Sequence, residues 1–400
     1  MTAGRAIIVG ASHAGAQLAA SLRQEGWTGE VVMIGDEPGL PYQRPPLSKA
    51  YLAGKSTFEE LAIRSADFYA KQEIRQTKGR VVAIDRSAPQ VDLSTGESLS
   101  YDKLALCTGA RPRLLPLPGA DLRDVYYLRT AADIELIRAV ATPGRRVVII
   151  GGGYIGLETA ASMNTLGLDV TVLEAADRVL QRVTAPEVSA FFERIHREAG
   201  VNIRTGTQVD SLAGDGRVQE VILASGESVP ADVVIVGIGV EPNIELAAEA
   251  GLTVDDGILI DPQARTSDPD IVAAGDCTSQ DMARYGRRIR LESVASAAEQ
   301  AKVAAATMCG KSKEITALPW FWSDQFDLKL QIAGLNTGYD DIVLNGDPTT
   351  DRDFSCYYLK QGALIAADCV NRPRDFTFSK RAITQNVQVG RADLIGAATN

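Results

Sequence analysis

The stretch IIVGASHAG, residues 7–15, decides the fold of this chain. An apolar run typical of a buried parallel strand leads into a glycine turn, and a helix with apolar periodicity follows. Glycines allow the backbone to approach a pyrophosphate, and the N-terminus of the helix offers N–H donors to it. The pattern predicts a dinucleotide-binding turn that contains Gly10, Ser12, Ala14 and Gly15.

A second stretch of the same kind, VIIGGGYIG, occupies residues 148–156. This copy has every glycine of the fingerprint, whereas the first has Ser12 where the middle glycine usually stands. A serine is acceptable there if its Cβ does not meet the phosphate. The predicted binding residues of the second turn are Gly151, Gly153, Tyr154, Ile155 and Gly156. Two such sites in one chain indicate that a flavin and a nicotinamide cofactor are held together, so that electrons can pass between them.

An acidic residue is expected after the second strand of each unit, where it accepts hydrogen bonds from ribose hydroxyls. In the second unit, the short strand 168–173 ends in Glu174. In the first unit, the strand 31–34 is followed by both Asp36 and Glu37. The spacing favours Asp36, and Glu37 is the alternative.

Three further buried strands are each followed by a glycine, at places where the chain is expected to pass close to a cofactor. The residues that follow these strands, called strand exits below, are Thr108-Gly109, Gly239 and Gly275-Asp276. The first two exits follow strands at matching places in the two halves, which therefore look like repeats of one architecture. From about Pro319 the pattern changes to aromatic-rich strands and turns, which indicates a separate C-terminal domain.

The composition excludes several classes of protein. A chain of 400 residues with 45% hydrophobic residues suits two or three globular domains. The net charge of −10 argues against broad nucleic-acid binding. No apolar run approaches the roughly 20 residues needed to cross a membrane. The strand expected at Ile7 leaves no room for a signal peptide, so a cytoplasmic location is predicted.

The five cysteines show neither a CxxC nor a CxxxxC spacing, so neither a metal site nor an iron–sulfur cluster is expected within the chain. They are better interpreted as free thiols in a reducing compartment. A disulfide reductase needs a redox cysteine pair after the first fingerprint, and residues 36–50 contain no cysteine. That activity is excluded, as is a peroxide or NADH oxidase that uses a single reactive cysteine near Tyr42.

Taken in order, the motifs resemble those of FAD-dependent ferredoxin reductases of the putidaredoxin reductase type. The resemblance rests on the two glycine turns together with PYQRPPLSK at 41–49, TSDP at 266–269 and PWFWSDQ at 319–325. It implies a glutathione reductase-like α/β fold with two Rossmann-like domains and a C-terminal α+β domain. The implied division is an FAD domain at 1–114 and 240–318, an NAD domain at 115–239 and a C-terminal domain at 319–400.

In such reductases FAD takes hydride from NADH and passes single electrons to a [2Fe–2S] ferredoxin. That ferredoxin serves a cytochrome P450 or a ring-hydroxylating dioxygenase. Alternative acceptors, of the rubredoxin or monodehydroascorbate type, stay open, as does a flavoprotein like apoptosis-inducing factor. The acidic chain favours an enzyme over the last of these. The resemblance places Arg64 on the surface that meets the ferredoxin. Lys311 and Lys313, which follow the helix expected at 297–309, are further candidate contacts for this partner.

The resemblance also implies roles for residues outside the glycine turns. Lys49, paired with Glu158, would lie by the flavin, and these two are the candidates for tuning it and shaping the nicotinamide slot. No separate catalytic base is expected, since hydride transfer depends on position and electrostatics. The further FAD contacts implied are Asp36, Arg44, Val81, Arg129, Asp276, Val294 and Trp320. Simpler interpretations are surface ion pairs for Arg44 and Arg129 and plain core for Val81 and Val294.

Overall fold

A computed structural model describes residues 4–396 and divides into two compact units. Each unit is built from three separate stretches of the chain. Unit 1 comprises Met1–Gln43, Leu61–Arg111 and Glu241–Pro319, and unit 2 comprises Arg44–Glu60, Pro112–Val240 and Trp320–Asn400. Strands β8 (Ala110–Pro112) and β17 (Val240–Pro242) lie where the chain passes from one unit to the other, and they pair as a two-stranded sheet.

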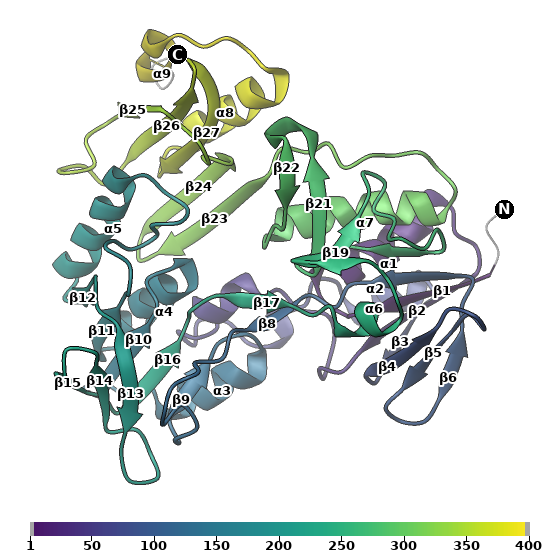
Figure 1. Ribbon diagram of the computed structural model, residues 1–400, viewed down its shortest axis with the longest axis horizontal. Coiled ribbons are helices and arrows are strands. Elements are labelled where there is room, and N and C mark those ends of the chain that lie inside the picture. Colours follow the sequence, from purple (N-terminus) through teal and green to yellow (C-terminus); the bar gives the residue numbers. More distant parts are fainter. Residues whose placement is uncertain (1–3, 397–400) are drawn as a thin grey trace. The chain divides into compact units, whose positions relative to one another are not determined.

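A five-stranded parallel sheet with the order β20-β7-β1-β2-β3 forms the centre of unit 1. Its inner strands β7, β1 and β2 are mostly apolar and buried, and Ile7 and Ile8 are fully buried, whereas the edge strand β3 is largely polar. Helices α1 (His13–Glu25) and α7 (Val294–Met308) pack against each other beside it (Figure 1). The strand bounds are β1 Arg5–Val9, β2 Glu30–Gly35, β3 Ile74–Lys78, β7 Lys103–Leu106 and β20 Ile271–Ala273.

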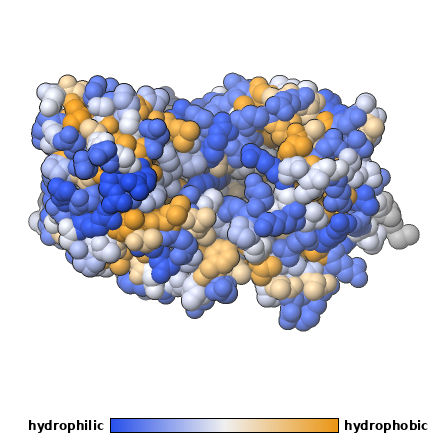
Figure 2. Space-filling model, turned by 90° about the horizontal axis from the view of Figure 1, so that it is seen from below, coloured by the Kyte–Doolittle hydropathy of each residue, from blue (hydrophilic) through white to orange (hydrophobic). Residues whose placement is uncertain are grey.

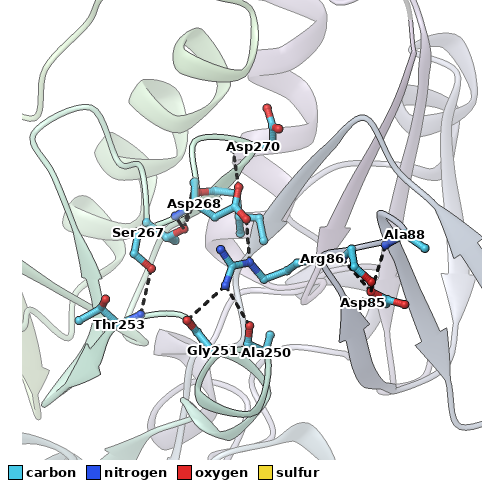
Figure 3. A network of polar contacts seen from close by, with 12 residues as sticks. Asp85, Arg86, Ala88, Ala250, Gly251, Thr253, Ser267, Asp268 and Asp270 are labelled. Atoms are coloured by element: carbon cyan, nitrogen blue, oxygen red, sulfur yellow. Dashed lines mark hydrogen bonds and ion pairs between the residues drawn. The ribbon is translucent and has the colours of Figure 1, made fainter.

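Two smaller sheets complete unit 1. They are β4-β5-β6 (Val81–Asp85, Gln90–Leu93, Ser98–Ser100) and β18-β19-β21-β22 (Val254–Asp255, Gly257–Ile260, Thr278–Met282, Arg287–Ile289), with short helices α2 (Ala66–Lys71) and α6 (Glu245–Glu249). Arg86 joins the first of these regions to the last stretch of the unit (Figure 3). Its Nε donates to Asp268 at 2.7 Å, and its Nη1 donates to the carbonyls of Ala250 and Gly251.

Unit 2 repeats the arrangement around a second parallel sheet, with the order β12-β11-β10-β16-β9. The strands β12, β11, β10 and β16 correspond to β3, β2, β1 and β7 of unit 1. Their bounds are β9 Val125–Tyr127, β10 Arg146–Ile150, β11 Asp169–Leu173, β12 Asn202–Arg204 and β16 Val233–Val236. Three helices, α3 (Ala131–Val140), α4 (Tyr154–Thr165) and α5 (Pro186–Glu198), and the antiparallel sheet β13-β14-β15 (Val209–Ala213, Glu220–Leu223, Ser228–Pro230) accompany it.

The C-terminal part of unit 2 is an antiparallel sheet with the order β23-β24-β27-β26-β25, and helix α8 packs on it. Three large aromatic side chains, Phe354, Tyr357 and Tyr358, are fully buried on β26 and form much of its core. The bounds are β23 Trp320–Gln325, β24 Leu328–Gly334, β25 Asp341–Asn345, β26 Phe354–Lys360, β27 Ala363–Val370, α8 Pro373–Gln385 and α9 Arg391–Gly396.

The predicted α/β class, with two Rossmann-like sheets and a C-terminal α+β region, is confirmed. Some element boundaries differ from those expected. The helix that precedes Lys311 begins at Val294, earlier than the expected residue 297, because the hydroxyl of Ser293 caps it by accepting from the N–H of Ser296. Hydrophilic residues dominate the face drawn in Figure 2, and hydrophobic ones occur there in small groups. Across residues 4–396, no helix has both the length and the hydropathy to cross a membrane.

Candidate functional site

The first glycine turn has the geometry of a phosphate cradle. Gly10, between β1 and α1, has φ of 111°, and a Cβ there would lie 2.1 Å from the carbonyl oxygen of Cys107. A Cβ on Gly15 would lie 1.9 Å from the carbonyl oxygen of Gly10. Glycine is therefore required at both positions, and it brings the first turn of α1 against the loop. Ser12 is the N-cap of α1 in an extended conformation.

The other predicted residues of unit 1 gather at one edge of its sheet. The strands β2, β1, β7 and β20 are adjacent and parallel, so the residues that follow them share the carboxyl edge, where ligands of such sheets bind. Gly275 has φ of 95°, and a Cβ on it would lie 3.1 Å from the Cβ of Ala14. The edge residues brought together are Gly10, Ser12, Ala14, Gly15, Asp36, Thr108, Gly109, Gly275 and Asp276.

The structure separates the two acids that follow β2. Asp36 is exposed at the edge, whereas Glu37 is half-buried and accepts a hydrogen bond from the hydroxyl of Tyr42. Asp36 is therefore the acid that keeps an exposed carboxylate at this edge.

Two side chains that sequence reasoning missed hold the strand exits in place. Asn243 donates its side-chain amide to the carbonyl of Thr108 at 2.8 Å and its backbone N–H to the carbonyl of Gly109 at 2.9 Å. Gln300 of α7, which is 2% exposed, accepts from the N–H of Gly275 at 2.8 Å. Neither residue belongs to a recognisable motif, because each acts from a segment far along the chain.

The second glycine turn repeats the first. A Cβ on Gly156 would lie 2.1 Å from the carbonyl oxygen of Gly151, and one on Gly151 would lie 2.4 Å from that of Gly237. Nothing lies within 4 Å of a Cβ built on Gly153. Gly153 corresponds to Ser12, so this position of the second turn also has room for a small side chain. Gly239 follows β16 with φ of 103°.

Glu174 is fixed beside the second turn by two backbone donors. Its Oε2 accepts from the N–H of Gly152 at 2.6 Å, and its Oε1 accepts from that of Ala176 at 2.8 Å. Arg178, the nearby cation, is engaged elsewhere, because its guanidinium donates to the carbonyls of Thr184 and Gln181 and to the hydroxyl of Ser189. The acid thus stands at the edge of the sheet, and the guanidinium of Arg178 is bound to other partners.

Lys49 and Glu158 form a nearly buried ion pair in unit 2. Their Nζ and Oε2 atoms are 2.6 Å apart, and the side chain of Glu158 is 4% exposed. The same Oε2 accepts from the hydroxyl of Ser48 at 2.6 Å, and Oε1 accepts from the hydroxyl of Ser323 at 2.7 Å. A buried carboxylate is stable only if protein donors replace its water ligands, and here Lys49, Ser48 and Ser323 do so. The partner expected for Lys49 is therefore present.

The PPLS segment carries Lys49 to this position. Residues Pro45–Ser48 form a 3₁₀ turn that packs on α4, and the hydroxyl of Ser162 on α4 donates to the carbonyl of Ser48 at 2.7 Å. The amine of Lys49 also donates to the carbonyl of Pro45 at 3.0 Å. The amine of Lys49 is therefore held by a backbone carbonyl of the 3₁₀ turn and by the carboxylate of Glu158 on α4.

The remaining predicted contacts have definite positions. Arg44 donates to the carbonyl of Arg129 at 2.7 Å, just before the capping box of α3, so the two arginines lie together in unit 2. Val81 is 7% exposed and belongs to the core of unit 1. Val294 is the first residue of α7.

The aromatic residues of β23 and α4 meet within unit 2. Trp320 stacks on Trp322 with ring centroids 5.6 Å apart. Tyr154, which begins α4, packs against Phe321 with centroids 4.8 Å apart, and burial raises its pKa well above the ordinary value. Ile155 beside it is 43% exposed and presents an apolar side chain at the second turn.

The residues expected to contact a ferredoxin differ in the contacts that their side chains make within this protein. Arg64 donates to Gln17 at 3.2 Å, and its guanidinium lies 4.6 Å from the centroid of the Phe68 ring. Lys311 forms an exposed ion pair with Glu25 at 2.8 Å. Lys313 is exposed. Arg64 is thus held by packing, whereas the charge of Lys311 is partly compensated.

The cysteines are free thiols, and four are buried. Burial raises the pKa of each buried thiol, including Cys107 and Cys277 near the carboxyl edge of the first sheet. Thiols with raised pKa values are poor nucleophiles. Among residues 4–396 no group of three or more His, Cys, Asp and Glu side chains could hold a metal ion.

Both cradles fit a dinucleotide. Each closes a helix N-terminus onto a strand end with glycines that no other residue could replace, and each has an acid after the next strand. Residues 4–304 match the family described as pyridine nucleotide-disulphide oxidoreductase, and residues 320–400 match the reductase C-terminal family. The chain belongs to the pyridine nucleotide-disulphide oxidoreductase family.

Individual relatives cover nearly the whole chain. Putidaredoxin reductase of Pseudomonas putida is 48% identical over 390 residues, 96% of this chain and 92% of that protein. A ferredoxin–NAD(P)(+) reductase of Sphingomonas sp. is 46% identical, over 94% of this chain and 92% of that one. The crystal structure of a covalent putidaredoxin reductase–putidaredoxin complex superposes with a TM-score of 0.94 at 46% identity, covering 99% of both chains. These proteins share the fold and the domain order of this chain.

Proposed function

We propose that this protein is an NADH-dependent flavoprotein that reduces a [2Fe–2S] ferredoxin, which serves a cytochrome P450 or a ring-hydroxylating dioxygenase. The main observation that supports this proposal is that one chain has two equivalent glycine cradles, each on its own parallel sheet. Family membership and relatives named as ferredoxin reductases support it. When bound, FAD supplies the conversion of a hydride from NADH into single electrons.

Unit 1 holds FAD in this proposal. Backbone donors at the N-terminus of α1 face the pyrophosphate, and glycine at Gly10 and Gly15 permits the close approach. Asp36 accepts from the adenosine ribose, and Asp276 accepts from a ribityl hydroxyl. Within unit 1, the residues proposed to line the rest of the cofactor are Val81, Thr108, Gly109, Gly275 and Val294. The resemblance also implies FAD contacts for Arg44, Arg129 and Trp320, which belong to unit 2.

Unit 2 holds NADH at its own glycine turn. Glu174 accepts from the two hydroxyls of the adenosine ribose, and its charge opposes a 2′-phosphate. Gly151, Gly153, Gly156 and Gly239 leave room for the phosphates, while Tyr154 and Ile155 line the first turn of α4.

Lys49 and Glu158 orient the reacting cofactors in this proposal. The amine is held by the carboxylate and by the carbonyl of Pro45, so it presents a fixed positive charge. A fixed charge in a dry site acts without reorganising during the reaction, which is the main way a protein assists hydride transfer. No proton need leave either residue.

Three further features belong to the proposal. The FAD domain comprises 1–114 and 240–318, the NAD domain 115–239 and the C-terminal domain 319–400. The protein works in the cytoplasm, because its five cysteines are free, as reducing compartments keep them. Arg64, Lys311 and Lys313 contribute to a small transient interface with the ferredoxin.

The acceptor is tested with purified components. Anaerobic NADH is mixed with the flavoprotein and with a panel comprising several [2Fe–2S] ferredoxins, a rubredoxin and monodehydroascorbate. The proposal predicts fast reduction of at least one ferredoxin and slow reduction of the other acceptors. Faster reduction of rubredoxin or monodehydroascorbate would assign the alternative acceptor, and slow turnover with all of them would favour a flavoprotein like apoptosis-inducing factor.

A further inference from the structure

A line of side-chain hydrogen bonds continues from Glu158 into the interior of unit 2. The hydroxyl of Ser323 contacts Glu158 Oε1 at 2.7 Å, and Gln325 Nε2 contacts Ser323 Oγ at 3.2 Å. Gln325 Oε1 in turn lies 2.9 Å from His196 Nε2. Ser323, Gln325 and His196 are each at most 1% exposed, so water does not replace these contacts. The line of hydrogen bonds that starts at Glu158 therefore ends at the buried imidazole of His196.

The register between α4 and β23 brings this line about. Ser323 and Gln325 are two residues apart on β23 and so face the same side as Phe321. Tyr154 and Glu158 are four residues apart on one face of α4. Four helical residues rise about 6 Å and two strand residues about 6.7 Å. The spacing of Tyr154 and Glu158 on α4 therefore nearly matches that of Phe321 and Ser323 on β23, so each side chain of one pair can face one of the other.

The hydrogen bonds have one consistent direction. Ser323 carries a single hydroxyl proton, and a carboxylate can only accept, so that proton goes to Glu158. Ser323 must then accept from the amide Nε2 of Gln325. The amide oxygen consequently faces His196 Nε2, which must carry a hydrogen.

The surroundings of His196 agree with that tautomer. Burial lowers the pKa of His196 to about 4, so near neutral pH the ring is uncharged and carries one N–H. Within the described residues Nδ1 has no hydrogen-bond partner. A proton on Nδ1 would thus be an orphaned buried donor, and the amide of Gln325 would have to turn over. Ser323 would then donate to the amide oxygen of Gln325, and Oε1 of Glu158 would lose the hydroxyl that donates to it.

We infer that His196, Gln325 and Ser323 are positioning residues that keep the carboxylate of Glu158 aimed at Lys49. The His196 tautomer fixes the Gln325 amide, the amide fixes the Ser323 hydroxyl, and the hydroxyl fixes the carboxylate. This inference rests on the role proposed above for Lys49 and Glu158 in hydride transfer.

The tautomer is measured directly by NMR. The chain has only two histidines, so holoenzyme labelled with ¹⁵N-histidine gives two imidazole spin systems, and a His13→Asn sample assigns them. His196 should be neutral with a protonated Nε2 at both pH 7 and pH 6. An Nδ1-protonated ring, or a charged ring at pH 6, overturns the inference.

The functional link is measured by a double-mutant cycle on flavin reduction by NADH in stopped flow. Ser323→Ala and Gln325→Leu should each slow reduction about tenfold, the scale of one lost hydrogen bond to a charged group. In a Glu158→Gln background the same changes should act by less than about twofold, because they work through that carboxylate. Equal effects in both backgrounds contradict the inference.

A matched control is Ser355→Ala. Ser355 is also fully buried and donates to a carboxylate, Asp375, at 2.8 Å, but on a different strand of the C-terminal sheet. It should leave the rate of flavin reduction unchanged. If Ser323→Ala and Gln325→Leu behave like Ser355→Ala while the wild type is reduced normally, only this inference fails. If NADH does not reduce the wild type, the proposed function fails, and the NMR result still decides whether the network exists.

Discussion

The carboxylate of Glu174 accepts a hydrogen bond from the N–H of Gly152 at 2.6 Å, which ties the acid after β11 to the second glycine turn. A second bond, from the N–H of Ala176 at 2.8 Å, fixes the other oxygen. Two backbone donors thus hold the acid against the glycine turn that is proposed to bind NADH. A 2′-phosphate would meet a negative charge whose position is fixed.

This relationship predicts a strong preference for NADH. The wild type should favour NADH over NADPH in kcat/KM by at least about 100-fold, since like charges in such a site cost several kcal/mol. Glu174→Gln should narrow the ratio by about tenfold or more, mainly through weaker use of NADH. Steady-state kinetics with both nucleotides check this. Asp177→Asn, which removes an exposed charge three residues later, is the control and should keep the ratio.

The thiols should be dispensable for hydride transfer. Burial raises the pKa values of Cys107, Cys277, Cys356 and Cys369, so these sulfurs stay protonated at neutral pH. Replacing all five cysteines with alanine should lower the melting temperature but leave the rate of flavin reduction by NADH within about twofold. A stopped-flow loss of that step in a folded variant would show that a thiol takes part.

Asp276 should matter for flavin retention. A charge-assisted hydrogen bond from a ribityl hydroxyl contributes roughly 1.5–3 kcal/mol, so Asp276→Ala should weaken FAD binding by about 10- to 150-fold. Equilibrium titration of apoprotein with FAD measures this. Asp281→Ala serves as the control, because Asp281 is exposed and pairs with Arg288. Equal affinity in the Asp276 and Asp281 variants would remove Asp276 from the flavin site.

The buried Asp368 should give stability a marked pH dependence. Burial raises its pKa from 3.8 to about 7, although the hydroxyl of Tyr358 donates to it. The folded state therefore holds this proton more tightly than the unfolded state, and stability falls as pH rises from about 4 to 7. Asp368→Asn should remove this fall, worth a few kcal/mol, so the variant should gain stability relative to wild type as pH rises.

Denaturant unfolding at pH 5, 6, 7 and 8 tests the prediction for Asp368. Asp169→Asn makes the same exchange at an exposed site on β11 and controls for the loss of one carboxylate. A difference between wild type and Asp368→Asn that stays constant across this range would mean that Asp368 is ionised in the folded protein throughout.

Sequence patterns were sufficient for the architecture and the two cradles, because strand periodicity and glycine spacing are local. Spacing already favoured Asp36 over Glu37, and the structure adds that Glu37 accepts a hydrogen bond from Tyr42, a contact that the sequence did not indicate. The supports of the site were not predictable. Asn243 and Gln300 act on strand exits from distant segments, and the line from Glu158 to His196 depends on packing of α4 and α5 with β23.

The central claim, that FAD binds the first cradle and NADH the second, is tested most directly by one glycine exchange in each. A Cβ on Gly15 would lie 1.9 Å from the nearest carbonyl oxygen, and a Cβ on Gly156 would lie 2.1 Å from its own. Gly15→Ala and Gly156→Ala therefore introduce similar steric clashes at the two sites. Far-UV circular dichroism first confirms that both variants are folded. Flavin content and NADH affinity are then measured on each. We predict that Gly15→Ala loses FAD, whereas Gly156→Ala keeps one FAD per chain but binds NADH much more weakly. Flavin lost from Gly156→Ala but retained by Gly15→Ala would contradict the assignment.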